Sequence, residues 1–123
     1  MPTILIVDDD AEIREMLVIH LTTAGYPVLT AGNGREALQL IAQSDLGIDL
    51  VLTDMFMPEK DGVEVVIDCN KRGLPVIGMS GGDRRGQQDT LRAAVHLGAA
   101  HTLHKPFSGD ELLALVAAAL RGK

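Results

Sequence analysis

The stretch Ile4-Leu5-Ile6-Val7-Asp8-Asp9-Asp10 places four aliphatic residues directly before three consecutive acids. A short run that is apolar at every position, rather than alternating, predicts a β-strand buried on both faces. In open sheets of such strands, ligands bind beyond the carboxyl ends, so the acids after the strand are expected at a binding edge. The stretch therefore predicts a buried strand that delivers carboxylates to one edge of an α/β sheet.

The rest of the chain repeats this arrangement of a short apolar run followed by a helical pattern. Further strands are predicted at residues 27–31, 50–52, 75–80 and 101–104. Helices are predicted over 10–24 and 33–43, in a segment ending near residue 73, around Leu91, and over 108–121. This order favours a doubly wound five-stranded parallel sheet, (βα)5, with helices on both faces. We expect residues 1–123 to form one such domain, with no effector domain among them.

Composition and charge limit the classes of function. The net charge is −6, and no run of basic residues is longer than Arg84-Arg85, which argues against direct nucleic-acid binding. The single cysteine, Cys69, excludes an intramolecular disulfide and indicates a reducing cytoplasm. No signal-peptide pattern is visible, and the longest apolar run, Leu112–Leu120, is nine residues, too short for a membrane span. A cytoplasmic domain without membrane contact is expected.

Polar side chains follow four of the five predicted strands. Asp8 and Asp9 follow the first strand, Asp54 the third, Ser80 the fourth and Lys105 the fifth. Two like charges about 4 Å apart repel by roughly 4 kcal/mol at an effective dielectric of 20, so clustered carboxylates either stay partly protonated or hold a cation. An all-oxygen ligand set at an open edge suits Mg²⁺. The pattern therefore indicates a magnesium site.

A carboxylate at this edge can also accept a phosphoryl group as a nucleophile. Phosphoryl transfer depends on positioning and on neutralising charge. The Lys105 ammonium, the Ser80 hydroxyl and a main-chain N–H near Gly81 are available for the phosphoryl oxygens. Each residue alone has an ordinary explanation as a helix cap, a solvated lysine or a turn serine, but together they indicate a phosphoryl acceptor site.

These pieces resemble the receiver domain of bacterial two-component response regulators, of the chemotaxis type. The resemblance covers essentially the whole chain, and its motifs are specific in combination. They are Ile4-Leu-Ile-Val-Asp-Asp-Asp10, Thr53-Asp-Met-Phe-Met-Pro58, Asp61-Gly62, Val76-Ile-Gly-Met-Ser80 and His104-Lys-Pro-Phe107. It implies a flavodoxin-like strand order, 2-1-3-4-5, and a signalling domain that catalyses only its own phosphorylation and dephosphorylation.

The resemblance also implies a role for each residue at the metal. Asp54 is the expected phosphoacceptor and a ligand of Mg²⁺. Asp9 is the expected direct ligand, and Asp8 a second acid acting largely through water. The main-chain carbonyl of Phe56 is expected to complete the protein's share of the metal shell.

Further roles concern the phosphoryl group and the switch. Lys105 is expected to pair with the phosphoryl group, and Ser80 to be the switch hydroxyl that moves toward it. A cis bond is expected between Lys105 and Pro106. Many receivers have an aromatic residue three positions before this lysine, whereas this chain has Thr102. We therefore predict that signalling relies on movement of the loop over residues 80–89, with Thr102 and His101 on or near the output face.

The expected partners follow from the same resemblance. A histidine kinase or a histidine phosphotransfer protein would donate the phosphoryl group, and a downstream effector protein or domain would read the switched face. That face consists of the helix around Leu91, the strand at 101–104 and the last helix. The last helix is apolar on nearly all sides, which leaves surface for docking or for homodimerisation.

Two other functions fit parts of the sequence. The acids Asp8-Asp9-Asp10 loosely resemble the Asp-x-Asp loop of haloacid-dehalogenase-type phosphatases, with Asp8 as the nucleophile. However, Ala11 replaces the Thr or Val expected after the second Asp, and a late acidic pair is missing. The other alternative is a phosphorylation-independent adaptor, which the complete set of acids, serine and lysine disfavours.

Overall fold

The structure is a computed structural model that describes residues 1–55, 57, 61–81, 98–99 and 101–121. Five parallel strands form one sheet in the order β2-β1-β3-β4-β5. The strands are β1 (Thr3–Val7), β2 (Val28–Ala31), β3 (Ile48–Asp54), β4 (Val76–Gly81) and β5 (His101–Lys105). The helices are α1 (Ala11–Thr23), α2 (Gly34–Ile41), the 3₁₀ helix η1 (Ser44–Leu46), α3 (Asp61–Lys71) and α5 (Gly109–Arg121). This architecture confirms the predicted fold class and strand order.

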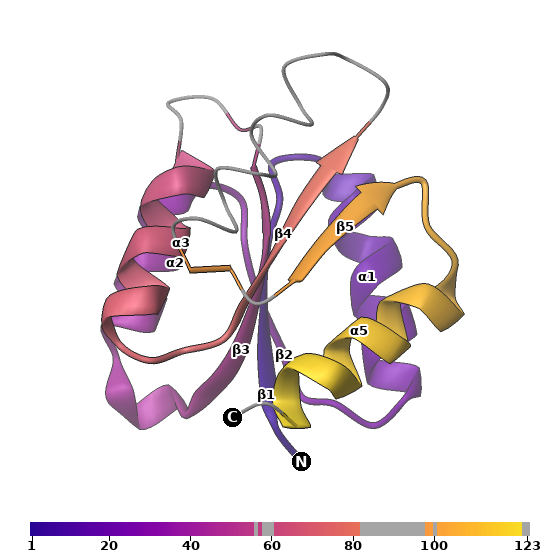
Figure 1. Ribbon diagram of the computed structural model, residues 1–123, viewed down its shortest axis with the longest axis horizontal. Helices are drawn as coiled ribbons and strands as arrows, with labels where there is room; N and C mark the ends of the chain where they lie inside the picture. Colours follow the sequence, from indigo (N-terminus) through magenta and orange to yellow (C-terminus); the bar gives the residue numbers. More distant parts are fainter. Residues whose placement is uncertain (56, 58–60, 82–97, 100, 122–123) are drawn as a thin grey trace.

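Helices cover both faces of the sheet, with α2 and α3 on one side and α1 and α5 on the other (Figure 1). Successive residues of a strand point to opposite faces, so each strand contributes to two separate cores. In β1, Leu5 and Val7 pack in the cluster that includes α2 and α3, whereas Ile4 and Ile6 pack in the cluster that includes α1 and α5. The double burial of β1 confirms the interpretation of its uniformly apolar sequence.

Side-chain caps fix where three helices begin. Asp10 accepts hydrogen bonds from the main-chain N–H groups of Glu12 and Ile13, at 2.9 and 3.4 Å. Asn33 and Ser108 each accept one from the residue three positions later, Glu36 or Glu111. These bonds satisfy N–H groups that the first turn of a helix leaves unpaired. Asp10 therefore acts as the N-cap of α1, a role different from that expected of the two acids before it.

The structure differs from the sequence-based expectation in several details. Strand β3 is longer than the predicted 50–52, and α2 ends at Ile41. The 3₁₀ helix η1 was not predicted. It ends at Leu46, and its C-cap residue Gly47 has a φ of +65°, which favours glycine. The helix predicted around Leu91 lies outside the described residues. No helix in the described ranges has the length and apolar character needed to cross a membrane.

Candidate functional site

The alternation of the strands determines which side chains meet at the carboxyl edge. Asp8 continues the alternation of Ile4 and Ile6, and Asp54 continues that of Leu50 and Leu52. Both acids therefore belong to the side of the sheet that α1 and α5 cover. Lys105 follows the buried Leu103 by two positions and belongs to the same side. The strands alone therefore place Asp8, Asp54 and Lys105 on the same side of the sheet at its carboxyl edge.

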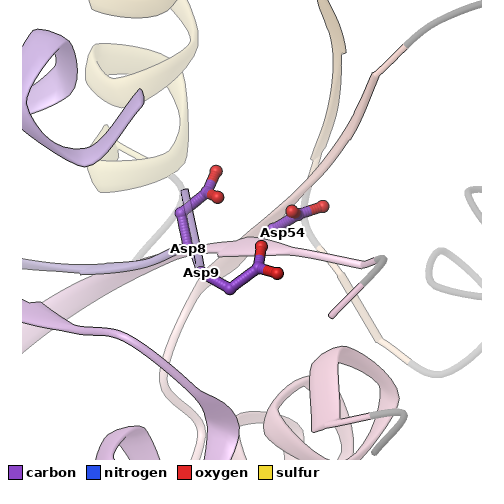
Figure 2. Close-up of side chains that lie close together, drawn as sticks. All are labelled: Asp8, Asp9 and Asp54. Atoms are coloured by element: carbon purple, nitrogen blue, oxygen red, sulfur yellow. The ribbon is translucent and has the colours of Figure 1, made fainter. Parts of the chain in front are cut away.

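Three carboxylates gather at this edge: Asp8 and Asp9 from the turn after β1, and Asp54 from the end of β3 (Figure 2). One oxygen from each lies within 4.8 Å of the others. Asp8 is fully buried, Asp54 is 6% exposed, and Asp9 is exposed. Two of the acids are therefore removed from water while the third faces it, so the cluster is open on one side.

Lys105 supplies the positive charge that partly balances the cluster. Its Nζ lies 2.8 Å from Oδ2 of Asp8 and 3.6 Å from Oδ2 of Asp54. The Lys105 side chain also lines an apolar cavity of about 240 Å³, together with Ile13, Met16, Pro106 and Phe107. Apolar packing of a lysine stem leaves its ammonium group at the polar end. The same residue therefore lines an apolar cavity and partly balances the charge of the three clustered carboxylates.

Main-chain hydrogen bonds hold the turn that bears Asp8 and Asp9. The Asp10 N–H donates to Oδ1 of Asp8 at 2.9 Å, and Arg14 Nη1 donates to the Asp8 main-chain oxygen at 2.6 Å. The Asp8 N–H donates to the main-chain oxygen of Ala31 on β2, at 3.2 Å. Arg14 was not predicted as a site residue. Its only sequence signal is its place in the first turn of the helix after the acids.

The end of β3 is fixed from two directions. The Met55 N–H donates to the main-chain oxygen of Met79 on β4 at 2.9 Å, and Asp54 pairs with Met79 in the parallel register. On the other side, Gly62 of α3 lies so close that a Cβ there would be 2.5 Å from the Asp54 main-chain oxygen. The start of α3 therefore packs directly against the backbone that bears Asp54.

Ser80 lies near the carboxyl end of β4, whereas the predicted switch residues His101 and Thr102 lie at the amino end of β5. Ser80 is fully buried on β4 and pairs in register with His104 of β5. His101 and Thr102 of β5 are partly buried. The Lys105–Pro106 peptide bond is cis, as the resemblance implied. Phe56 and the predicted switch loop beyond Gly81 lie outside the described residues.

The donor set fits a hard divalent cation. All the clustered ligand atoms are carboxylate oxygens, and within the described ranges this is the group of acids, histidines and cysteines that could hold a metal ion. Mg²⁺ binds to oxygen, uses one or two carboxylates and keeps several waters, which an open cluster permits. The acid cluster is therefore of the type that binds Mg²⁺ in receiver domains.

The fold and the acid cluster define a class of signalling protein, and sequence comparison agrees. Residues 4–117 match the family model of the response regulator receiver domain, and the chain belongs to this family. It is a receiver domain of two-component signalling, a phosphoacceptor module rather than a classical enzyme. This membership argues against the phosphatase interpretation.

Individual relatives show how far the likeness extends. The chain is 38% identical over 122 residues to a protein named transcriptional regulatory protein CpxR homolog from Haemophilus influenzae, covering 98% of this chain and 51% of that protein. It is similar to the crystal structure of a receiver domain protein from Clostridium thermocellum, with a TM-score of 0.89 and 29% identity over 98% of this chain and 95% of that one. It is also similar to the receiver domain of Francisella response regulator 1452, with a TM-score of 0.83, 30% identity and complete coverage of both chains. The chain spans about half the length of the curated relatives it matches.

Proposed function

We propose that residues 1–123 act as one receiver domain in which Asp54 accepts a phosphoryl group from a phosphohistidine. The donor is a histidine kinase or a histidine phosphotransfer protein. The observation that supports this most is the juxtaposition of three carboxylates within 4.8 Å with a lysine ammonium that contacts two of them. The arrangement combines a nucleophile, cation ligands and a fixed positive charge, which are the parts that phosphoryl transfer needs.

In the proposed reaction, an Asp54 carboxylate oxygen attacks the phosphorus of the phosphohistidine. The new O–P bond forms as the N–P bond breaks, and the electron pair of that bond stays on the imidazole nitrogen. Lys105 is near enough to Asp54, at 3.6 Å, to contact a phosphoryl oxygen attached there. Ser80, one residue beyond the β4 partner of Asp54, is the proposed second contact.

Asp9, Asp54 and the main-chain carbonyl of Phe56 are the proposed direct ligands of Mg²⁺, with Asp8 acting largely through water. When bound, Mg²⁺ would neutralise charge on the phosphoryl oxygens. Asp8 is well suited to an indirect role, because its Oδ1 accepts the Asp10 N–H and its Oδ2 accepts Lys105. Its carboxylate is thereby held in place.

The proposed output is a change of the face that includes β5, α5 and the segment around Leu91. Ser80 would move toward the phosphoryl group, and Thr102 and His101 would report the change to a downstream effector or to a second copy of the chain. Thr102 pairs with Gly78 on β4, two residues before Ser80, which supports coupling between the two strands.

Phosphorylation by acetyl phosphate with Mg²⁺, followed by intact mass spectrometry, tests the acceptor. We expect Asp54→Asn to abolish phosphorylation and Asp8→Asn to reduce it without abolishing it. Asp45→Asn is the matched control, because Asp45 is exposed on η1. Phosphorylation that survives Asp54→Asn but not Asp8→Asn would support the phosphatase-like chemistry instead. An unmodified wild-type chain would favour the adaptor function.

A further inference from the structure

Arg14 reaches from the first turn of α1 back to the end of β1. Its Nη1 donates to the main-chain oxygen of Asp8 at 2.6 Å, and the side chain is partly buried. The same guanidinium lies over the turn between β2 and α2, since Nη1 is 3.5 Å from the point where a Cβ on Gly32 would lie. A Cβ at that position would be in ordinary van der Waals contact with the guanidinium, so Arg14 packs against this turn. The contact therefore joins three segments of the chain at the acid edge.

Asp9 depends on its backbone more than the other two acids do. Its carboxylate is exposed, and no other described residue forms a hydrogen bond with it. Both peptide groups that flank Asp9 are nevertheless held by side chains. Arg14 holds the carbonyl of the preceding one, and Oδ1 of Asp8 accepts the N–H of the following one at 2.9 Å. These two bonds therefore fix the backbone from which the Asp9 side chain extends.

We propose that Arg14 is a positioning residue for divalent-cation binding, because it fixes the Asp8–Asp9 peptide and so aims the Asp9 carboxylate at the shared site. The inference rests on the metal site of the proposed function and adds a residue to it. Arg14 donates to a main-chain oxygen and is not itself a metal ligand. Its effect is like that of the outer partners that orient metal ligands in other proteins.

Positioning and simple electrostatics predict opposite results when Arg14 is removed. A guanidinium near a cation site repels the cation, so loss of its charge alone would tighten metal binding. Loss of positioning would weaken it. Mg²⁺ requires near-ideal octahedral geometry, whereas Ca²⁺ accepts variable geometry, so misplacement of Asp9 should weaken Mg²⁺ binding more than Ca²⁺ binding.

The test is isothermal titration calorimetry of MgCl₂ and of CaCl₂, at constant ionic strength, into the wild-type chain and its variants. We expect about tenfold weaker Mg²⁺ binding in Arg14→Met, with a smaller change for Ca²⁺. Arg14→Lys keeps the charge but lacks the planar fork, and it should lose most of the same affinity. Arg35→Met removes a similar charge from an exposed position on α2 and should bind Mg²⁺ as the wild type does.

Urea unfolding of each variant accompanies the titrations, and Arg14→Lys provides the measurement if Arg14→Met does not fold. Unchanged or tighter Mg²⁺ binding in a folded Arg14 variant overturns the role of Arg14. So does an equal loss of Mg²⁺ and Ca²⁺ affinity, because general loosening of the fold would not discriminate between the ions. Failure of the wild-type chain to bind Mg²⁺ removes the metal site of the proposed function and this inference with it. If the wild-type chain binds Mg²⁺ and the Arg14 variants bind it equally well, only the proposed role of Arg14 is overturned, and the metal site stands.

Discussion

Gly62 sits where α3 approaches the acceptor strand most closely, and replacing it with alanine should disturb both stability and phosphorylation. A Cβ at this position would lie 2.5 Å from the Asp54 main-chain oxygen and 2.7 Å from Cα of Met55. Ordinary contact begins at 3.4 Å, so one of the two segments must move by about 0.9 Å. Both neighbours are backbone atoms, which cannot rotate away as a flexible side chain could.

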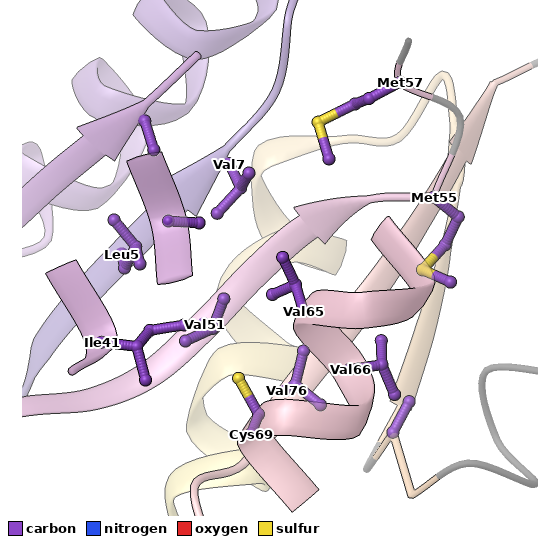
Figure 3. Packing of buried hydrophobic residues seen from close by; sticks show 13 residues of the cluster. Leu5, Val7, Ile41, Val51, Met55, Met57, Val65, Val66, Cys69 and Val76 are labelled. Carbon is purple, nitrogen blue, oxygen red and sulfur yellow. The ribbon is translucent and has the colours of Figure 1, made fainter. Parts of the chain in front are cut away.

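Neither segment can move freely. On the inner side of α3, Val65, Val66 and Cys69 are fully buried and pack in the same cluster as Val51 and Val76 (Figure 3). Forcing extra volume into a packed region costs about 1–3 kcal/mol, and the better helix propensity of alanine returns up to about 1 kcal/mol. We expect Gly62→Ala to lower the free energy of unfolding by about 1–2 kcal/mol.

The effect on phosphorylation should be larger than the effect on stability implies. A displacement of nearly 1 Å at a reacting group can reduce a rate by about 10²-fold, so we expect a ten- to hundredfold slower reaction with acetyl phosphate. The assays are urea unfolding and the time course of phosphorylation by intact mass spectrometry.

Gly47→Ala is the matched control for Gly62→Ala. Gly47 has a φ of +65° with no atom within 4 Å of its Cβ position, and it precedes β3 at the end opposite Asp54. Alanine there should cost about 1–2 kcal/mol through backbone strain alone and leave the phosphorylation rate unchanged. Equal rate losses in the two variants, or a wild-type rate in Gly62→Ala, would refute the argument that the close approach positions Asp54.

Two further predictions follow from buried charges and thiols. Lys105→Met should tighten Mg²⁺ binding by about tenfold, because the Lys105 ammonium lies 2.8 Å from Asp8 and 3.6 Å from Asp54 and so competes with the cation for these carboxylates. Calorimetry measures this, and weaker binding would contradict it. Burial, and then the nearby Asp68 charge, raises the pKa of the Cys69 thiol from 9.0 to about 12. The folded chain holds this proton more tightly than the unfolded chain, so stability should fall as the pH rises from about 9 toward 12. Urea midpoints measured at pH 8 and pH 10 should show this loss, and a Cys69→Ala variant should show less of it.

Much of the fold could be predicted because the signals are local. The uniformly apolar sequence of β1 and the capping residues Asn33 and Ser108 determine strand burial and helix starts over a few neighbouring positions. The proximity of Asp8 and Asp54 could also be predicted, because each follows or ends a strand and the carboxyl ends of parallel strands meet at one edge of the sheet. Sequence order therefore sufficed to predict which acids meet.

The remaining details depend on how the sheet and helices pack together. The 2.8 Å contact between Lys105 and Asp8 depends on the three-dimensional path of a side chain over two intervening strands. Arg14 contacts a main-chain oxygen, and such a contact leaves no pairing signal in the sequence. The capping at η1 likewise depends on a left-handed Gly47, one of many glycines in the chain.

The ion pair between Lys105 and Asp8 joins residues 97 positions apart. Lys105 ends β5, the last strand in the sequence, and Asp8 follows β1, the first. A chain that has formed its first four strands but not β5 would hold the Asp8 carboxylate at the edge without its ammonium partner. Leaving a buried charge unpaired is costly, so the acid edge should stay loose until the last strand is in place. A nascent or truncated chain would then lack both the ion pair at Asp8 and the positive charge beside Asp54, so the ability to accept a phosphoryl group would arise only when the fold is complete.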